Sequence, residues 1–380
     1  MITIRSLTLA IAGALSATLA HADVTIGVSI SLTGPTSALG VPTKNGIELW
    51  PKTIAGEKLN VIVLDDATDP TQGVKNARRF ITEDKVDVIV GSVATPIAVA
   101  LSDVATEGQT VQLMLSPANL PEGKGAWSFR MPQSTAVMAI PIVEQWKKLG
   151  VKTYGFLGYA DAYGEAWLKD LVPLADKAGI KLVATERFAR ADTSVTGQAL
   201  KLVSANPDAI LVVASGSGAA MPHKGLVERG YAKSKIYQTH GAASFDLIRV
   251  GGADVEGSYV VSGPAVVAPK LPDSNASKVL GVRYVTEYEK AYGKGMANQF
   301  GAHAFDVVIV LEKAIPLALK KARPGTPEFR AALKTALETM GRTPVSQGVL
   351  NFTASDHFGY TPETGVMLKI VSGEWQVVPN

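Results

Sequence analysis

Short apolar runs recur along the chain from residue 24 onwards, and the segments between them carry apolar residues at helical spacing. The run at 86–91, Val-Asp-Val-Ile-Val-Gly, has no polar alternation after its aspartate, which suits a strand covered on both faces in a parallel sheet. Strands of this kind are predicted at 24–30, 60–65, 86–91, 111–116, 153–158, 180–185, 209–214 and 235–239.

Helix signals lie between these strands. Asp69-Pro70 followed by Gln72 resembles a capping box, and Thr326-Pro327 begins an amphipathic helix that Gly341 ends. The chain is therefore α/β. The connection around 120–150 separates two sets of four strands, which predicts two sheets, one in each lobe. The segment from 347 onwards is rich in turns and short β runs, as expected of antiparallel edge strands.

The junction after the strand at 86–91 is a candidate anion site. Thr95-Pro96 has the pattern of an N-cap and a first helical residue. Free backbone N–H groups, the positive end of the helix dipole and a hydroxyl would then meet at one place, where a carboxylate or phosphate can bind. An ordinary capped turn explains this stretch equally well.

Composition narrows the class of protein. The 380 residues are 47% hydrophobic and 19% charged, enough for a large core and two domains. The net charge of +3 comes without a long Lys/Arg run, so neither nucleic acid nor an anionic membrane is indicated as a partner.

Residues 1–22 have the layout of a secretory signal. Arg5 precedes an apolar segment, and Ala-His-Ala before Asp23 predicts cleavage after Ala22. A membrane anchor is the competing interpretation, but the segment is short for a bilayer and no second span follows. The chain has no cysteine, so neither a disulfide nor a lipid-bearing thiol is possible. We expect a soluble exported protein in a Gram-negative periplasm that is not inserted in the membrane.

The sequence offers no catalytic set. Gly216 and Gly218 almost match a dinucleotide-binding fingerprint, but Met221 stands where the third small residue is needed. We therefore expect a glycine-rich binding loop at this place and no nucleotide site. The scattered histidines lack metal-ligand spacing. Asp65-Asp66 could hold a cation, although such a pair more often caps a loop. We therefore expect that the protein is not an enzyme and that it holds no metal and no cofactor.

Six stretches in order resemble the periplasmic leucine/isoleucine/valine-binding proteins of ABC importers: VTIGVSISLTGPTSALG, DDATDPTQGVKNARRFI, VDVIVGSVATP, LMLSPANLPE, YADAYGEAWLKD and GGADVEGSYV. The resemblance covers the mature chain. It implies a type I periplasmic binding protein fold, with two doubly wound parallel-sheet lobes, three crossover strands near 134, 263 and 341, and a ligand cleft between the lobes. It implies a first lobe of 23–133 plus 264–340 and a second of 134–263 plus 341–380. It also implies a monomer that delivers its ligand to permease and ATPase subunits.

The resemblance places ligand-binding residues in that cleft. Thr95 would receive the ligand carboxylate, Tyr163 would close from the second lobe, and Leu39 and Phe300 would line an apolar end. The backbone of Ala118, Asn119 and Leu120 would lie beside Thr95, and the remaining expected contacts are Ser215, Gly216 and His240.

Departures from the family pattern change the expected ligand. Amino-acid binders carry a carboxylate for the ligand ammonium where this chain has His240, a threonine where it has Leu120, and in some members cysteines where it has Ala67 and Ala94. An unpaired ammonium in a closed cleft is costly. We therefore favour a small carboxylate without an α-ammonium, such as an aromatic or aliphatic organic acid.

Two alternatives stay open. One is uptake of branched-chain or related amino acids, and the other is a periplasmic ligand sensor. His240 is expected to titrate near neutrality and to make binding depend on pH, unless it is only a hydrogen-bonded loop histidine.

Overall fold

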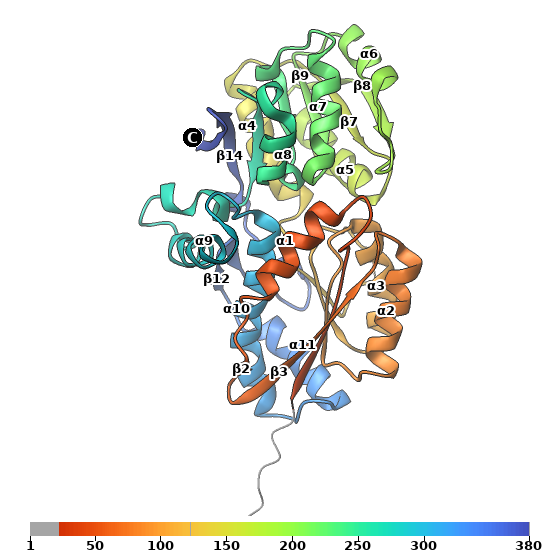
Figure 1. Ribbon diagram of the computed structural model, residues 1–380, viewed down its shortest axis with the longest axis vertical. Coiled ribbons are helices and arrows are strands. Elements are labelled where there is room, and N and C mark those ends of the chain that lie inside the picture. Colours follow the sequence, from red (N-terminus) through yellow and green to blue (C-terminus); the bar gives the residue numbers. More distant parts are fainter. Residues whose placement is uncertain (1–22, 122, 380) are drawn as a thin grey trace, which may run out of the picture.

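The computed structural model describes residues 23–121 and 123–379. Figure 1 shows two bodies stacked along the long axis, with the α2–α3 side in one and α4–α8 in the other. The predicted signal segment, 1–22, lies outside the described residues. Within the described ranges no helix is long and apolar enough to cross a membrane.

The first sheet has the order β2-β3-β1-β4-β5-β6, and all its pairings are parallel except that of β2 with β3. The run predicted to be covered on both faces is indeed buried throughout as β4. Residues of α1, α10 and α11 share one buried cluster with the sheet, and α2 and α3 share another. The elements are β1 (Val24–Ile30), α1 (Ser37–Ile47), β2 (Thr53–Ile54), β3 (Glu57–Asp65), α2 (Pro70–Thr82), β4 (Val88–Gly91), α3 (Thr95–Glu107), β5 (Val111–Met114), β6 (Ser128–Arg130), α10 (Gln299–Leu319) and α11 (Pro327–Thr339).

The second sheet has the order β15-β14-β11-β10-β9-β7-β8. Its strands from β7 to β11 are parallel, and β14 and β15 add antiparallel pairs at one edge, as the turn-rich tail predicted. Helices α4 to α8 contribute to the same buried cluster as these strands. The elements are α4 (Thr135–Lys148), β7 (Thr153–Tyr159), α5 (Ala162–Lys177), β8 (Lys181–Phe188), α6 (Thr196–Ser204), β9 (Ala209–Val213), α7 (Ala220–Val227), β10 (Ile236–Gln238), α8 (Phe245–Gly251), β11 (Tyr259–Ser262), β14 (Val366–Val371) and β15 (Glu374–Val377).

The chain passes between the sheets more than once. It leaves the first sheet after β6, and after β11 it runs through a short 3-10 segment, η5 (Pro264–Lys270), and α9 (Lys278–Tyr292) to reach α10. A two-stranded antiparallel ribbon, β12 (Thr343–Val345) and β13 (Gly348–Leu350), follows α11. Segments far apart in sequence therefore build each lobe.

The return to the second lobe comes later than the expected boundary at 341. Val345, Leu350, Phe352 and Tyr360 belong to the same buried cluster as the first sheet. The chain joins the second sheet only at β14. The apolar side chains of 345–360 fill the first core, which is why this stretch belongs there.

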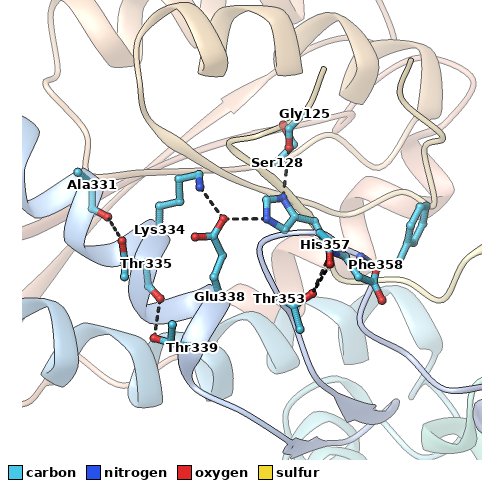
Figure 2. A network of polar contacts seen from close by, with 12 residues as sticks. Gly125, Ser128, Ala331, Lys334, Thr335, Glu338, Thr339, Thr353, His357 and Phe358 are labelled. Atoms are coloured by element: carbon cyan, nitrogen blue, oxygen red, sulfur yellow. Dashed lines mark hydrogen bonds and ion pairs between the residues drawn. The ribbon is translucent and has the colours of Figure 1, made fainter. Parts of the chain in front are cut away.

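Polar contacts hold the same stretch against the first lobe (Figure 2). Glu338 Oε1 on α11 accepts from Lys334 Nζ at 2.5 Å and lies 3.1 Å from His357 Nε2. The His357 ring stacks on Phe129 of β6 with centroids 3.9 Å apart. This cluster links α11, β6 and the segment before β14.

The helix signals are confirmed in part. Asp69 caps α2 by accepting from the amides of Thr71 and Gln72, and Thr326 caps α11. The capping box itself is incomplete, because the side-chain amide of Gln72 donates to Asn76 Oδ1 instead of turning back to the backbone of Asp69.

Candidate ligand-binding site

A cavity of about 350 Å³, including its mouth, lies between the two sheets. Much of its wall follows the carboxyl ends of parallel strands: Val93 after β4, Arg190 after β8, Ser215 after β9 and His240 after β10. Ligands bind at this edge in open α/β sheets. Among the residues expected at the site, Leu39, Thr95, Tyr163, Ser215, His240 and Phe300 line the cavity.

Four expected contacts are not on the cavity wall. Ala118 is fully buried and its carbonyl accepts from Arg130 Nε, while Leu120 lines a different, surface pocket. The Asn119 amide donates to Asp170 of α5 at 3.4 Å. The chain turns away after Pro117, so this backbone is used for structure and not for the cavity.

Gly216 is the fourth, and it holds a contact between the lobes. A β-carbon on Gly216 would lie 3.0 Å from Cβ of Ala38 on α1. The φ of Gly216 is +55°, a conformation that non-glycine residues adopt at a cost. The two lobes therefore meet at this glycine, beside the cavity.

Thr95 sits one position further into the helix than expected. Ala94 is the N-cap of α3 and Thr95 is the first helical residue, with Pro96 after it. The side chain of Ala94 cannot cap the helix, and the Thr95 side chain is almost fully buried in the cavity wall. The amides of Ile97 and Ala98 already donate to the Ala94 carbonyl and Pro96 has no N–H, so the Thr95 amide and hydroxyl are the groups at this helix start that remain available to an anion.

Tyr163 is the second residue of α5, whose N-cap is Asp161. Its hydroxyl donates to Thr239 Oγ1 at 2.9 Å and accepts from the Gly241 amide at 3.3 Å. Burial raises the pKa of this phenol to about 12, so it stays protonated. These bonds fix the ring as part of the cavity wall on the second-lobe side.

His240 is only 2% exposed, and neither ring nitrogen has a hydrogen-bond partner in the described structure. Burial lowers the pKa of the imidazole to about 3. The expectation that His240 titrates near neutrality is therefore wrong, because burial takes the water away that would stabilise the charged ring.

Arg190 is a cavity residue that sequence reasoning missed. Its Nε donates to Asp161 Oδ2 at 2.6 Å, its Nη1 donates to Ser215 Oγ at 3.1 Å, and its guanidinium lies 4.1 Å from the Tyr159 ring centroid. Among the described residues Asp161 is the carboxylate that pairs with Arg190, so its remaining N–H groups can serve a ligand. The signal that could have found it is its place just after the predicted strand at 180–185, at the carboxyl end where ligands bind.

The rest of the wall is apolar or uncharged. Leu39 and Phe300 belong to the first-lobe core and present one face to the cavity. Besides Arg190, the residues that were not expected there are Val93, Leu115, Pro117, Pro132, Gly241, Gln299 and His303. Arg190 is thus the one formally charged side chain among the described lining residues.

The Asp65-Asp66 pair has a structural role. Asp65 accepts from the amides of Leu32 and Ala67, and Asp66 accepts from the hydroxyls of Ser31 and Ser92. These bonds connect three loops at the carboxyl edge of the first sheet. No group of three or more potential metal ligands occurs within 23–121 and 123–379.

Comparisons with known proteins agree on one family. A family model described as periplasmic binding protein matches residues 23–369. The Leu/Ile/Val-binding protein BraC3 of Rhizobium johnstonii is 27% identical over 370 residues, which are 92% of this chain and 93% of that protein.

Solved structures are similar throughout. An extracellular ligand-binding receptor from Rhodopseudomonas palustris is 47% identical with a TM-score of 0.91, covering 94% of this chain and 99% of its own. A solute-binding protein of an ABC transporter from R. palustris, solved in complex with benzoate, has a TM-score of 0.78 over 94% and 96% of the chains. At 16% identity it shows the shared fold alone.

Proposed function

The chain belongs to the periplasmic binding protein family, with its type I fold, and we propose that it captures a small carboxylate lacking an α-ammonium group for an ABC importer. The favoured ligands are aromatic or aliphatic organic acids.

One observation carries this proposal: Arg190 is the only formally charged side chain among the described residues of the cavity wall. A ligand carboxylate can accept from its free N–H groups, and such charge-assisted bonds are the strong ones. A ligand ammonium would find no carboxylate on the wall, since Asp161 is already bound to Arg190. An amino acid would have to leave its ammonium poorly paired.

The start of α3 supplies the Thr95 amide and hydroxyl as further donors. The Thr95 hydroxyl and the start of α3 face the same cavity from the first lobe, whereas Arg190 faces it from the second. A carboxylate that accepts hydrogen bonds from both lobes at once stabilises the closed form of the protein. Leu39, Val93 and Phe300 supply the apolar area that must contribute much of the ~8 kcal/mol needed for micromolar binding.

The mechanism is capture without chemistry. Ligand bound between the lobes shifts an equilibrium between open and closed forms, because only the closed form contacts it from both sides. The closed protein is then recognised by permease and ATPase subunits. A periplasmic sensor would use the same closure with a different partner.

Uptake of branched-chain amino acids is the second candidate, favoured by the name of the R. johnstonii relative. The test is a thermal-shift and calorimetric screen of leucine, isoleucine and valine against benzoate, phenylacetate and butanoate. A ligand that binds the folded form raises the melting temperature by mass action. Benzamide, which has the shape of benzoate without its charge, is the control. Stabilisation by the amino acids alone would overturn the proposal.

A further inference from the structure

Two histidines from different lobes line the same cavity. His240 begins the 3-10 turn η3 (His240–Ala242) after β10, and His303 lies on α10. Each residue is 2% exposed. The charge of one would act directly on the other, since His240 contributes to the lowered pKa of His303.

Both imidazoles carry hydrogen-bonding atoms without partners. In the described structure neither Nδ1 nor Nε2 of His240 has one, and Nε2 of His303 has none. The Tyr163 ring lies 6.0 Å from the His240 ring, and its hydroxyl is committed to Thr239 and Gly241. A buried polar atom without a partner costs about 1–3 kcal/mol. Several such atoms in one cavity indicate that a bound molecule supplies their hydrogen-bond partners.

The two rings are uncharged at neutral pH. Burial lowers the pKa of both imidazoles to about 3, so each ring has one N–H donor and one lone pair. No other titratable side chain lines the cavity among the described residues except Arg190 and Tyr163. The two imidazoles thus offer both hydrogen-bond donors and acceptors. A carboxylate only accepts hydrogen bonds, and a cationic donor is available to it at Arg190.

We propose that His240 and His303 together bind a hydroxyl group of the ligand, which makes the preferred ligand a hydroxylated carboxylic acid. A hydroxyl both donates and accepts, so it can satisfy a lone pair on one ring and an N–H on the other. The inference rests on the proposed function, because the carboxylate must occupy the charged donors for the imidazoles to remain free for this second group.

Matched pairs of acids test the subsite. Benzoate, phenylacetate and butanoate are compared by calorimetry with their 3- and 4-hydroxy derivatives, first on the wild-type chain. The same titrations follow on His240→Phe and His303→Phe, which keep a ring of similar size but no nitrogen. Each variant's affinity for the parent acid reports whether its cavity is intact.

The expected result is that at least one hydroxy acid binds about tenfold or more tightly than its parent, and that either variant removes most of this preference. Parent and hydroxy acids that bind equally well would overturn the subsite but leave the proposed function standing, with a water molecule on the imidazoles instead. A preference that survives both substitutions also overturns it. If no acid binds and a branched-chain amino acid does, the proposed function fails and this inference with it.

Discussion

A β-carbon placed on Gly216 would lie 2.8 Å from Cδ1 of Leu39 and 3.0 Å from Cβ of Ala38, so a larger residue in the glycine-rich loop of the second lobe would push against α1 of the first. This contact lies beside the cavity, whose wall includes Leu39 and Ser215. The approach of the two lobes therefore depends on a residue that does not itself line the cavity.

Gly216→Ala should weaken ligand binding by about tenfold, because the new methyl group opposes closure. Gly230→Ala is the matched control, since Gly230 also has a positive φ of +81° but nothing within 4 Å of its would-be β-carbon. Both variants should lose about 1–2 kcal/mol of unfolding free energy from backbone strain. Calorimetry should find the affinity loss in Gly216→Ala alone; equal affinities would contradict a role in closure.

Arg190→Met should reduce the affinity for a carboxylate ligand by about 10- to 100-fold. The change removes the charged donor and also leaves Asp161 unpaired beside the cavity. Arg187→Met, which breaks an exposed pair with Glu165, should bind as the wild type does. Titration with the best acid from the screen measures both. Wild-type affinity in Arg190→Met would place the carboxylate elsewhere.

Thr95→Val should cost about tenfold in affinity for the same acid, because it removes the hydroxyl at the free end of α3 while keeping the side-chain shape. Thr106→Val, at an exposed position on the same helix, is the control. If the two variants bind alike, the carboxylate does not use the Thr95 hydroxyl.

Acid should destabilise the fold through its buried histidines. Burial lowers the pKa of His223 to about 4, and its Nε2 lies 2.9 Å from the Asp254 carbonyl. The folded state then binds fewer protons than the unfolded state between pH 6.5 and about 4. The contribution to stability is therefore complete above pH 6.5 and is lost as the pH falls through this window.

Urea unfolding at pH 7.5, 6.0 and 5.0 measures this loss. The free energy of unfolding should fall with a slope of up to about 1.4 kcal/mol per pH unit for each such histidine. His223→Gln cannot titrate, so its slope should be shallower than that of the wild type. Parallel slopes would mean that folding does not lower the pKa of His223.

Glu338→Gln should lower the free energy of unfolding by about 1–3 kcal/mol, because Glu338 pairs with both Lys334 and His357 in a largely buried cluster (Figure 2). Glu287→Gln, from an exposed pair with Arg283, should change it by less than about 0.5 kcal/mol. Denaturant titration compares them. A loss in Glu338→Gln no larger than in the control would mean that the cluster adds no stability.

The local elements were predictable because their causes are local. Unbroken apolar runs and capping residues such as Asp69 and Thr326 depend on a few neighbouring positions, and these positions gave the strands and helix starts. Thr95, Tyr163 and His240 could be placed at the cavity through the family resemblance and their position after predicted strands.

Long-range placement was not predictable in the same way. Nothing near His303 in sequence marks it as a cavity residue, since it lies on a helix that returns to the first lobe more than a hundred residues later. Arg190 follows a predicted strand, but only the packing of the sheet edge decides that its side chain faces the cavity. The direction of the Ala118–Leu120 backbone depends on Arg130, and the ionisation of His240 depends on how completely other segments exclude water from it.

The sequence by itself thus determined the α/β class, the alternation of strands and helices, and which loops could meet at the ligand cleft. Only the tertiary structure decided which side chains face that cleft, where the last segment packs, and which groups there are charged. The reason is physical: periodicity and capping act over a few residues, whereas burial, electrostatics and the contact between Gly216 and Leu39 arise only when distant segments come together.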